Sequence, residues 1–215
     1  MCANWQRRSC LPCAAGKRSV KPMATVQTKK MTAAEFAEKY ANSEVRAELI
    51  RGEVHEMSPT KTPHGKYTMR VSIPIGQYVQ EHGLGEVFAA ETGFLIRHSD
   101  GNESVRAPDM AFIRVERLPE EEPQEYWDIM PDLVIEVLSS GDRTKDVYEK
   151  TQMWLEAGVR LVWNVDPYKQ TVTVHRADGS VQTLGPGDIL SGEDVLPGFE
   201  LPVSQIFRPV KRSGL

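Results

Sequence analysis

The sequence predicts one mixed α/β domain, built on a central β-sheet that is flanked by helices and extended by β-hairpins. An almost continuous apolar run at Leu133–Leu138 is typical of a strand buried on both faces. A helical pattern follows it at Arg143–Ala157, and Leu161–Val165 is a second apolar strand. This strand–helix–strand order implies a right-handed crossover between parallel neighbours. Since other segments pair as hairpins around this one crossover unit, we expect a mixed α/β sheet rather than a pure β-sandwich.

The chain before the central strand begins with a capped helix and a hairpin. The predicted helix Met31–Tyr40 opens with a capping box, because Thr32 is followed by Glu35. Ala47–Met57 alternates apolar and polar residues about the dipeptide Arg51-Gly52, which predicts two antiparallel strands joined by a tight turn.

A longer helix and short strands follow. Ser58–Pro63 contains two prolines and is predicted to be a loop. His64–Glu81 has apolar residues at helical spacing, although Pro74 should kink or shorten the helix. Gly85–Arg97 should form two short strands, and Asp109–Ile113 another.

The rest of the chain is predicted to be an acidic surface loop and a second hairpin. Arg117–Asp128 is acidic and contains proline, which indicates a solvated loop. Beyond the crossover, Thr171–His175 and Ser180–Leu184 flank the turn dipeptide Asp178-Gly179. These two strands should form a hairpin.

Composition and charge exclude several classes of protein. With 40% hydrophobic and 26% charged residues, and no apolar run near the roughly 18 residues of a membrane-spanning helix, the chain should be neither a membrane protein nor wholly disordered. Seven of its 26 basic residues and none of its 30 acidic ones lie in residues 1–30, so residues 31–215 carry a formal charge of −11. Broad electrostatic attraction to DNA is unavailable to such a body. Nucleic-acid chemistry would need a local groove, bound metal ions or the basic segment.

Residues 1–30 are predicted to be a basic, disordered leader. All three cysteines lie in it, so the body has no disulfide, as is usual in a reducing cytoplasm. Cys10 and Cys13 form a single CxxC, which supplies only half the ligands of a structural zinc site. The leader lacks the apolar core of a signal peptide, and we expect a cytoplasmic protein. One folded domain should span 31–207, with a tail at 208–215.

Two acidic residues stand where the pattern requires burial. Glu136 lies in the middle of the most apolar strand, and Asp109 opens another apolar strand directly after Pro108. An unpaired carboxylate would be costly to bury, so each needs a partner. The partner is either a structural salt bridge or a metal ion. Two acids on adjacent strands are a plausible site for a hard cation such as Mg²⁺.

Lys150 is a possible third member of this site. On the predicted helix after Glu136, the buried stripe is defined by Val147, Thr151, Trp154 and Leu155. Lys150 falls at the edge of that stripe, so its side chain can reach the sheet. A lysine in such a position often only extends along the apolar surface toward water.

These residues carry a resemblance to a known family. Pro108-Asp109, Glu136 within Asp132–Ser139, and Lys150 together resemble the PD-(D/E)xK nuclease superfamily, specifically its Uma-type restriction endonuclease branch. The resemblance extends over about residues 31–207. Further matching segments, in order, are Ala47–Glu53, the loop from Ser58 to His64, Ala157–Val159, Val162-Trp163 and Leu196–Phe199.

The resemblance implies a restriction-endonuclease-like core and a set of roles. Asp109 and Glu136 would be metal ligands and catalytic residues, with Mg²⁺ or Mn²⁺ as the cofactor, and Glu48 would be a further ligand. Leu138 stands where the lysine of the ExK motif should be, and Lys150 resembles a migrated form of that catalytic lysine. His64 would contact phosphate or tune the site, unless it only caps a helix.

The implied reaction is metal-assisted hydrolysis of DNA phosphodiester bonds, with Lys150 orienting the attacking water and offsetting charge in the transition state. The main alternative is a catalytically inactive nuclease fold that binds nucleic acid or protein, which the acidic body and the displaced lysine favour and the two retained acids oppose. A carboxylate-pair enzyme such as a glycoside hydrolase explains the acids but not Lys150. A homodimer would supply two opposed sites for a duplex.

Overall fold

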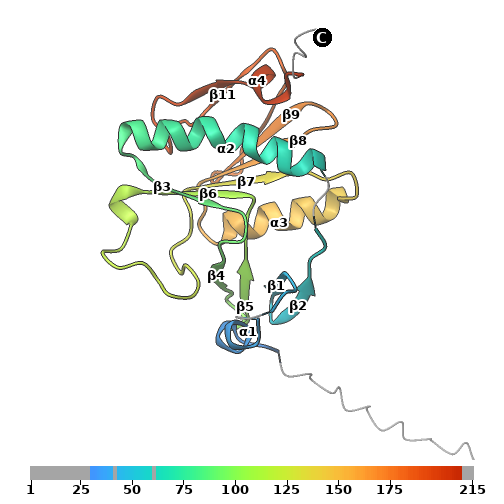
Figure 1. The fold of residues 1–215 in the computed structure, drawn as a ribbon, viewed down its shortest axis with the longest axis vertical. Helices are drawn as coiled ribbons and strands as arrows, with labels where there is room; N and C mark the ends of the chain where they lie inside the picture. The colour runs from blue at the N-terminus through green and yellow to red at the C-terminus, as the bar shows by residue number, and fades with distance from the viewer. Residues whose placement is uncertain (1–29, 41–42, 60–61, 210–215) are drawn as a thin grey trace, which may run out of the picture.

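The architecture is that of a computed structural model, which describes residues 30–40, 43–59 and 62–209 (Figure 1). The predictions for the leader, for Cys10 and Cys13 and for most of the tail lie outside these residues, and the domain limits remain predictions. Across the described ranges, no helix is both long and apolar enough to cross a membrane.

In chain order the elements are α1 Ala33–Tyr40, β1 Ala47–Ile50, β2 Glu53–Glu56, α2 Thr62–His82, β3 Gly85–Ala89, β4 Phe94–Arg97, β5 Glu103–Arg106, β6 Met110–Arg114, the 3-10 turn η1 Val115–Arg117, β7 Leu133–Val137, α3 Thr144–Glu156, β8 Leu161–Asp166, β9 Thr171–Arg176, β10 Val181–Leu184, β11 Ile189–Ser191, β12 Glu200–Pro202 and α4 Val203–Phe207.

The largest sheet is mixed and has the strand order β10-β9-β8-β7-β6-β3. Strands β7 and β8 are parallel, with Leu133 opposite Leu161, and α3 connects them. The remaining neighbours are antiparallel. All residues of β7 are buried, as expected of a central strand with both faces covered. The predicted mixed α/β sheet with a parallel crossover is therefore confirmed.

Helices cover both faces of this sheet (Figure 1). On one face, Val71 and Ile75 of α2 pack with Ile135 of β7, and α4 and the β11–β12 hairpin complete the layer. On the other face, Trp154 of α3 packs with Val134 of β7. Because side chains alternate along a strand, Ile135 and Val134 serve opposite cores. The residue after Ile135, which is Glu136, must therefore lie on the α3 face.

A second sheet, of order β2-β1-β5-β4, lies next to the α3 side of the molecule (Figure 1). Its core joins Leu49 of β1 and Val105 of β5 to Phe36 of α1. The β1–β2 hairpin is the predicted one, and its turn residues Arg51 and Gly52 have φ values of 48° and 80°. Such left-handed values are typical of a tight hairpin turn. Strand β5, by contrast, was not expected from the sequence.

The structure has the predicted capping box at the start of α1 but differs from the prediction in α2. The amide of Thr32 donates to Glu35 Oε2 at 2.9 Å, and the amide of Glu35 donates to Thr32 Oγ1 at 3.2 Å, which is the predicted capping box. Helix α2 runs from Thr62 to His82 through Pro74, so this proline does not shorten it, while the alternative expectation of a kink stays a prediction. Val71 and Ile75 are fully buried on either side of Pro74. Their packing offsets the backbone hydrogen bond that proline cannot donate.

Candidate active site

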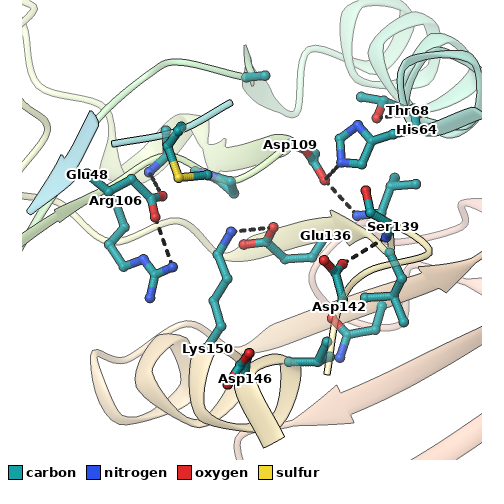
Figure 2. A pocket seen from close by; sticks show the side chains of 18 of the residues that line it. Glu48, His64, Thr68, Arg106, Asp109, Glu136, Ser139, Asp142, Asp146 and Lys150 are labelled. Carbon is teal, nitrogen blue, oxygen red and sulfur yellow. Dashed lines mark hydrogen bonds and ion pairs between the residues drawn. The ribbon is translucent and has the colours of Figure 1, made fainter. Parts of the chain in front are cut away.

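A cavity of about 690 Å³ opens between the two sheets, α3 and the first turn of α2. All five residues singled out from the sequence line it, as Figure 2 shows: Glu48, His64, Asp109, Glu136 and Lys150. They come from β1, α2, the segment before β6, β7 and α3 respectively. The fold thus brings together side chains that are spread over about half of the chain.

Glu136 lines the cavity from strand β7 and is only 8% exposed. Its Oε2 accepts a hydrogen bond from Lys150 Nζ at 2.7 Å, and its Oε1 accepts one from Trp154 Nε1 at 2.9 Å. Burial, opposed by the Lys150 ammonium group, raises the pKa of Glu136, and the negative charge of Asp109 raises that pKa further. The strand therefore holds a carboxylate whose charge depends on its cationic neighbour.

Lys150 points from α3 toward the sheet (Figure 2). Its side chain is 23% exposed, whereas that of Lys145 on the opposite side of the helix is 80% exposed. The helical spacing predicted this difference. The two alternatives left open for Glu136 were a structural ion pair and a metal site. The ion pair with Lys150 is present, and the metal site stays a prediction.

Asp109 lies beside Glu136 at the sheet end. Met110 pairs with Ile135 in the antiparallel β6–β7 ladder, so continuing that register by one residue places Asp109 opposite Glu136. Its Oδ2 accepts a hydrogen bond from the amide of Val137 at 2.7 Å. This bond fixes the carboxylate against the neighbouring strand. Asp109 Oδ1 makes no hydrogen bond to the described residues.

His64 approaches Asp109 from the first turn of α2. Its Nε2 lies 3.1 Å from Asp109 Oδ2, and both side chains are largely buried, at 12% and 16% exposure. The hydrogen bond to Asp109, opposed by burial, raises the pKa of His64. His64 is thus part of the acidic cluster and does more than begin the helix.

Glu48 lies across the cavity, paired with Arg106 (Figure 2). Its Oε2 accepts from Arg106 Nη2 at 2.9 Å and its Oε1 from the amide of Ala107 at 3.2 Å. Burial raises the pKa of Glu48 more than any other single effect, but the charges of Lys150 and Arg106 and these hydrogen bonds together lower it below the usual value. Carboxylate oxygens keep further lone pairs, so these contacts do not test the predicted role of Glu48 as a metal ligand.

The carboxylates suit a hard divalent cation, although they form no closed cage. Within the described ranges, no three histidine, cysteine or acidic side chains are close enough to share one ion. Mg²⁺, however, is usually held by one or two carboxylates, with water and substrate phosphate completing its octahedron. Asp109 and Glu136 are a donor set of that kind. The cavity is also acidic, since it is lined by six carboxylates and three lysine or arginine side chains.

Three further residues line the cavity or contact a residue that lines it, but were not assigned roles from the sequence. Trp154 was assigned only to the buried stripe of α3, yet it binds Glu136. Arg106 lies three residues before Asp109 and carries no motif of its own. Asn164 is a buried polar residue on β8, opposite Glu136, and donates to Thr151 Oγ1 at 2.9 Å. The argument that singled out Glu136, a polar residue within an apolar strand, would also have found Asn164.

The fold described above is similar to that of a solved structure. The chain is similar to a crystal structure described as "a putative nuclease belonging to DUF820" from Anabaena variabilis, with a TM-score of 0.69 and 23% sequence identity. The match covers 82% of this chain and 97% of the other. The fold is therefore that of a DUF820 nuclease structure, as the restriction-endonuclease-like prediction anticipated.

Residues 33–204 match the family model Uma2, described as "Putative restriction endonuclease". Because this match spans most of the chain, the protein belongs to the Uma2 family. No curated protein matches the sequence.

Proposed function

We propose that this chain is a divalent-metal-dependent endonuclease that hydrolyses DNA phosphodiester bonds. One observation carries the proposal: Asp109, Glu136 and Lys150 converge on a single cavity from three elements, with Glu136 buried in the central strand. A buried, hydrogen-bonded carboxylate beside a lysine in a cavity is an arrangement that is common at functional sites. Membership of the Uma2 family supports the same reaction class.

Asp109 and Glu136 would hold the metal, Mg²⁺ or Mn²⁺, with Glu48 as a further ligand directly or through water. When bound, such an ion polarises the scissile phosphate and lowers the pKa of the attacking water. The excess of carboxylates over cationic side chains in the cavity supports this assignment. Without added positive charge, so acidic a site would repel a phosphodiester.

Lys150 would act on the substrate from the helix side. Its ammonium group, 2.7 Å from Glu136 Oε2, has three donors and can share them between that carboxylate and a phosphate oxygen or water. In this position it would orient the attacking water and stabilise negative charge on the phosphate as the bond to the leaving oxygen breaks. In this proposal Lys150 takes the role of the ExK lysine, whose position in the sequence is occupied by Leu138.

His64 and the backbone would orient the carboxylate of Asp109. The Asp109 side chain is held by His64 and by the amide of Val137. These two hydrogen bonds restrict Oδ2, so the remaining lone pairs of Asp109 are available in a fixed direction. In this account His64 is an accessory residue, which positions Asp109 or contacts phosphate.

Cleavage of supercoiled plasmid and of single-stranded DNA in Mg²⁺ or Mn²⁺ tests the proposal. We expect the wild type to cut, D109N and E136Q to fall to background, and K150M to lose about 100-fold. The matched control is K145M, a lysine on the exposed side of the same helix, which should cut like the wild type. Activity that survives both carboxylate substitutions would exclude this site.

A catalytically inactive binding module is the second candidate. It is favoured by the fact that both Glu136 oxygens already have protein partners, Lys150 and Trp154, as in a purely structural ion pair. This candidate predicts DNA or protein binding without cleavage under any metal. If duplex cleavage is seen, we further expect a homodimer with two opposed sites, which light scattering of the wild type would detect.

A further inference from the structure

Arg106 is the least satisfied charged group in the cavity wall. A guanidinium group has five N–H donors. Nη2 donates to Glu48 Oε2 at 2.9 Å, and the partner of Nη1 is the sulfur of Met153 at 3.8 Å. Nε is buried and has no hydrogen-bond partner among the described residues. A buried donor without an acceptor destabilises the fold, so this arrangement calls for a role.

The position of Arg106 suggests a ligand for Nη1, which has only the weak sulfur acceptor of Met153, whereas the buried Nε lies out of reach of a ligand in the cavity. Its side chain is 13% exposed and lines the same cavity as Asp109, Glu136 and Lys150. Figure 2 shows Arg106 on the side of Lys150 away from Asp109 and His64. A nucleic-acid strand that presents one phosphate to the acid pair would present a neighbouring phosphate along the same cavity. The planar fork of arginine matches phosphate oxygens, and its charge cannot be lost at physiological pH.

We propose that Arg106 binds a backbone phosphate next to the scissile one, and that Glu48 holds its guanidinium group in place. The inference rests on the proposed function and adds a substrate contact to it. Glu48 lies on β1 and Arg106 at the end of β5, strands that pair in the second sheet. That sheet, outside the mixed sheet that carries Asp109 and Glu136, would therefore contribute to substrate binding.

The energetics suit a pre-oriented anion site. Glu48 is 6% exposed and takes a second hydrogen bond from the amide of Ala107, so it is fixed independently of Arg106. A side chain that is already held loses little conformational freedom when a ligand binds. Lys150 lies near enough to lower the pKa of Glu48 together with Arg106, so two cations share this wall of the cavity.

The test compares two variants that share the loss of the Glu48 charge, and the glutamine of E48Q keeps an oxygen that can accept the hydrogen bond from Arg106 Nη2. R106Q alone would leave Glu48 buried without its partner, so the comparison is between E48Q and E48Q/R106Q, each checked by thermal unfolding. Any effect of losing Glu48, including one on a metal, is common to both. Binding is measured by fluorescence anisotropy of a labelled DNA duplex in Ca²⁺ over a series of salt concentrations.

We expect E48Q/R106Q to bind the duplex about tenfold more weakly than E48Q. The slope of log affinity against log salt concentration should also be smaller, by about the value of one phosphate contact. E48Q/R46Q is the charge control, because Arg46 lines the same cavity but is half-exposed and pairs with Glu91. Equal affinity and slope for E48Q and E48Q/R106Q would overturn the inference, as would an equal loss in E48Q/R46Q. Failure of the wild type to bind DNA at all would instead reject the proposed function and the inference with it.

Discussion

Lys150 Nζ lies 2.7 Å from Glu136 Oε2, so a cation from helix α3 is paired with a carboxylate in the middle of the central strand. The two residues are 14 positions apart, and the β7–α3–β8 crossover brings them together. This ion pair opposes the effect of burial on Glu136 and helps to keep an acid charged inside the sheet. It also leaves Lys150 at the cavity, where a phosphate would approach.

Removing the cation should destabilise the fold. In K150M the Glu136 carboxylate loses its counter-ion, and breaking a partly buried pair of this kind should lower the free energy of unfolding by about 3 kcal/mol at neutral pH. K145M, on the solvent side of α3, should change it by less than about 0.5 kcal/mol. Urea unfolding in EDTA measures both. Equal losses in the two variants would show that Glu136 does not depend on Lys150.

Trp154 should position Glu136 through a single hydrogen bond. W154F keeps most of the ring but loses the donor to Glu136 Oε1, whereas W163F is the matched control, since Trp163 is equally buried and its Nε1 has no partner in the described part of the chain. The loss of stability in W154F should exceed that in W163F by about 1.5 kcal/mol, the value of a hydrogen bond to a charged group.

The same comparison has a functional readout. W154F should also bind Mn²⁺ about tenfold more weakly than W163F, because outer residues that orient a metal ligand affect affinity by about that factor. Titration calorimetry measures the difference. If both variants bind Mn²⁺ equally well, Trp154 contributes only to packing.

The His64–Asp109 pair should make stability depend on pH. The pKa of His64 is raised above its usual 6.5 in the folded chain, so the folded state binds this proton more tightly than the unfolded state does. Its contribution should be fully present below about pH 6.5 and lost as pH rises through the raised pKa. Urea unfolding of the wild type and H64Q in EDTA at about pH 6 and pH 9 would show a larger difference at the lower pH.

Asp109 provides the control for that dependence. In a D109N background the hydrogen-bonding partner of His64 carries no charge, so the larger effect of H64Q at the lower pH should be much reduced. A pH-dependent effect of H64Q that persists in D109N would assign it to other neighbours of His64.

The central part of the fold could be predicted because its signals are local. Apolar runs of strand length, helical periodicity and a turn dipeptide identify β7, α3, β8 and the β1–β2 hairpin without knowledge of their partners. The same reasoning placed Lys150 on the sheet side of α3 and required partners for Asp109 and Glu136. Those predictions concern which face of an element a residue occupies, and periodicity is sufficient for that.

Other features depend on contacts between distant segments and could not be predicted. Glu48 and Arg106 are 58 positions apart, and their contact depends on the pairing of β1 with β5, a strand that was not expected. The hydrogen bond from Trp154 likewise requires knowing how α3 lies on β7. Pro74 does not end α2, because Val71 and Ile75 on either side of it pack against the central sheet. That packing cannot be inferred from the helix sequence alone.

The most direct test of the central claim is calorimetric titration of Mn²⁺ into the wild type, D109N and E136Q. If Asp109 and Glu136 form the metal site, the wild type should bind Mn²⁺ and each substitution should abolish or greatly weaken binding, while thermal unfolding shows that all three proteins are folded. Undiminished binding in both variants, or no binding by the wild type at millimolar Mn²⁺ with DNA present, would contradict the claim and leave the two acids with a structural role.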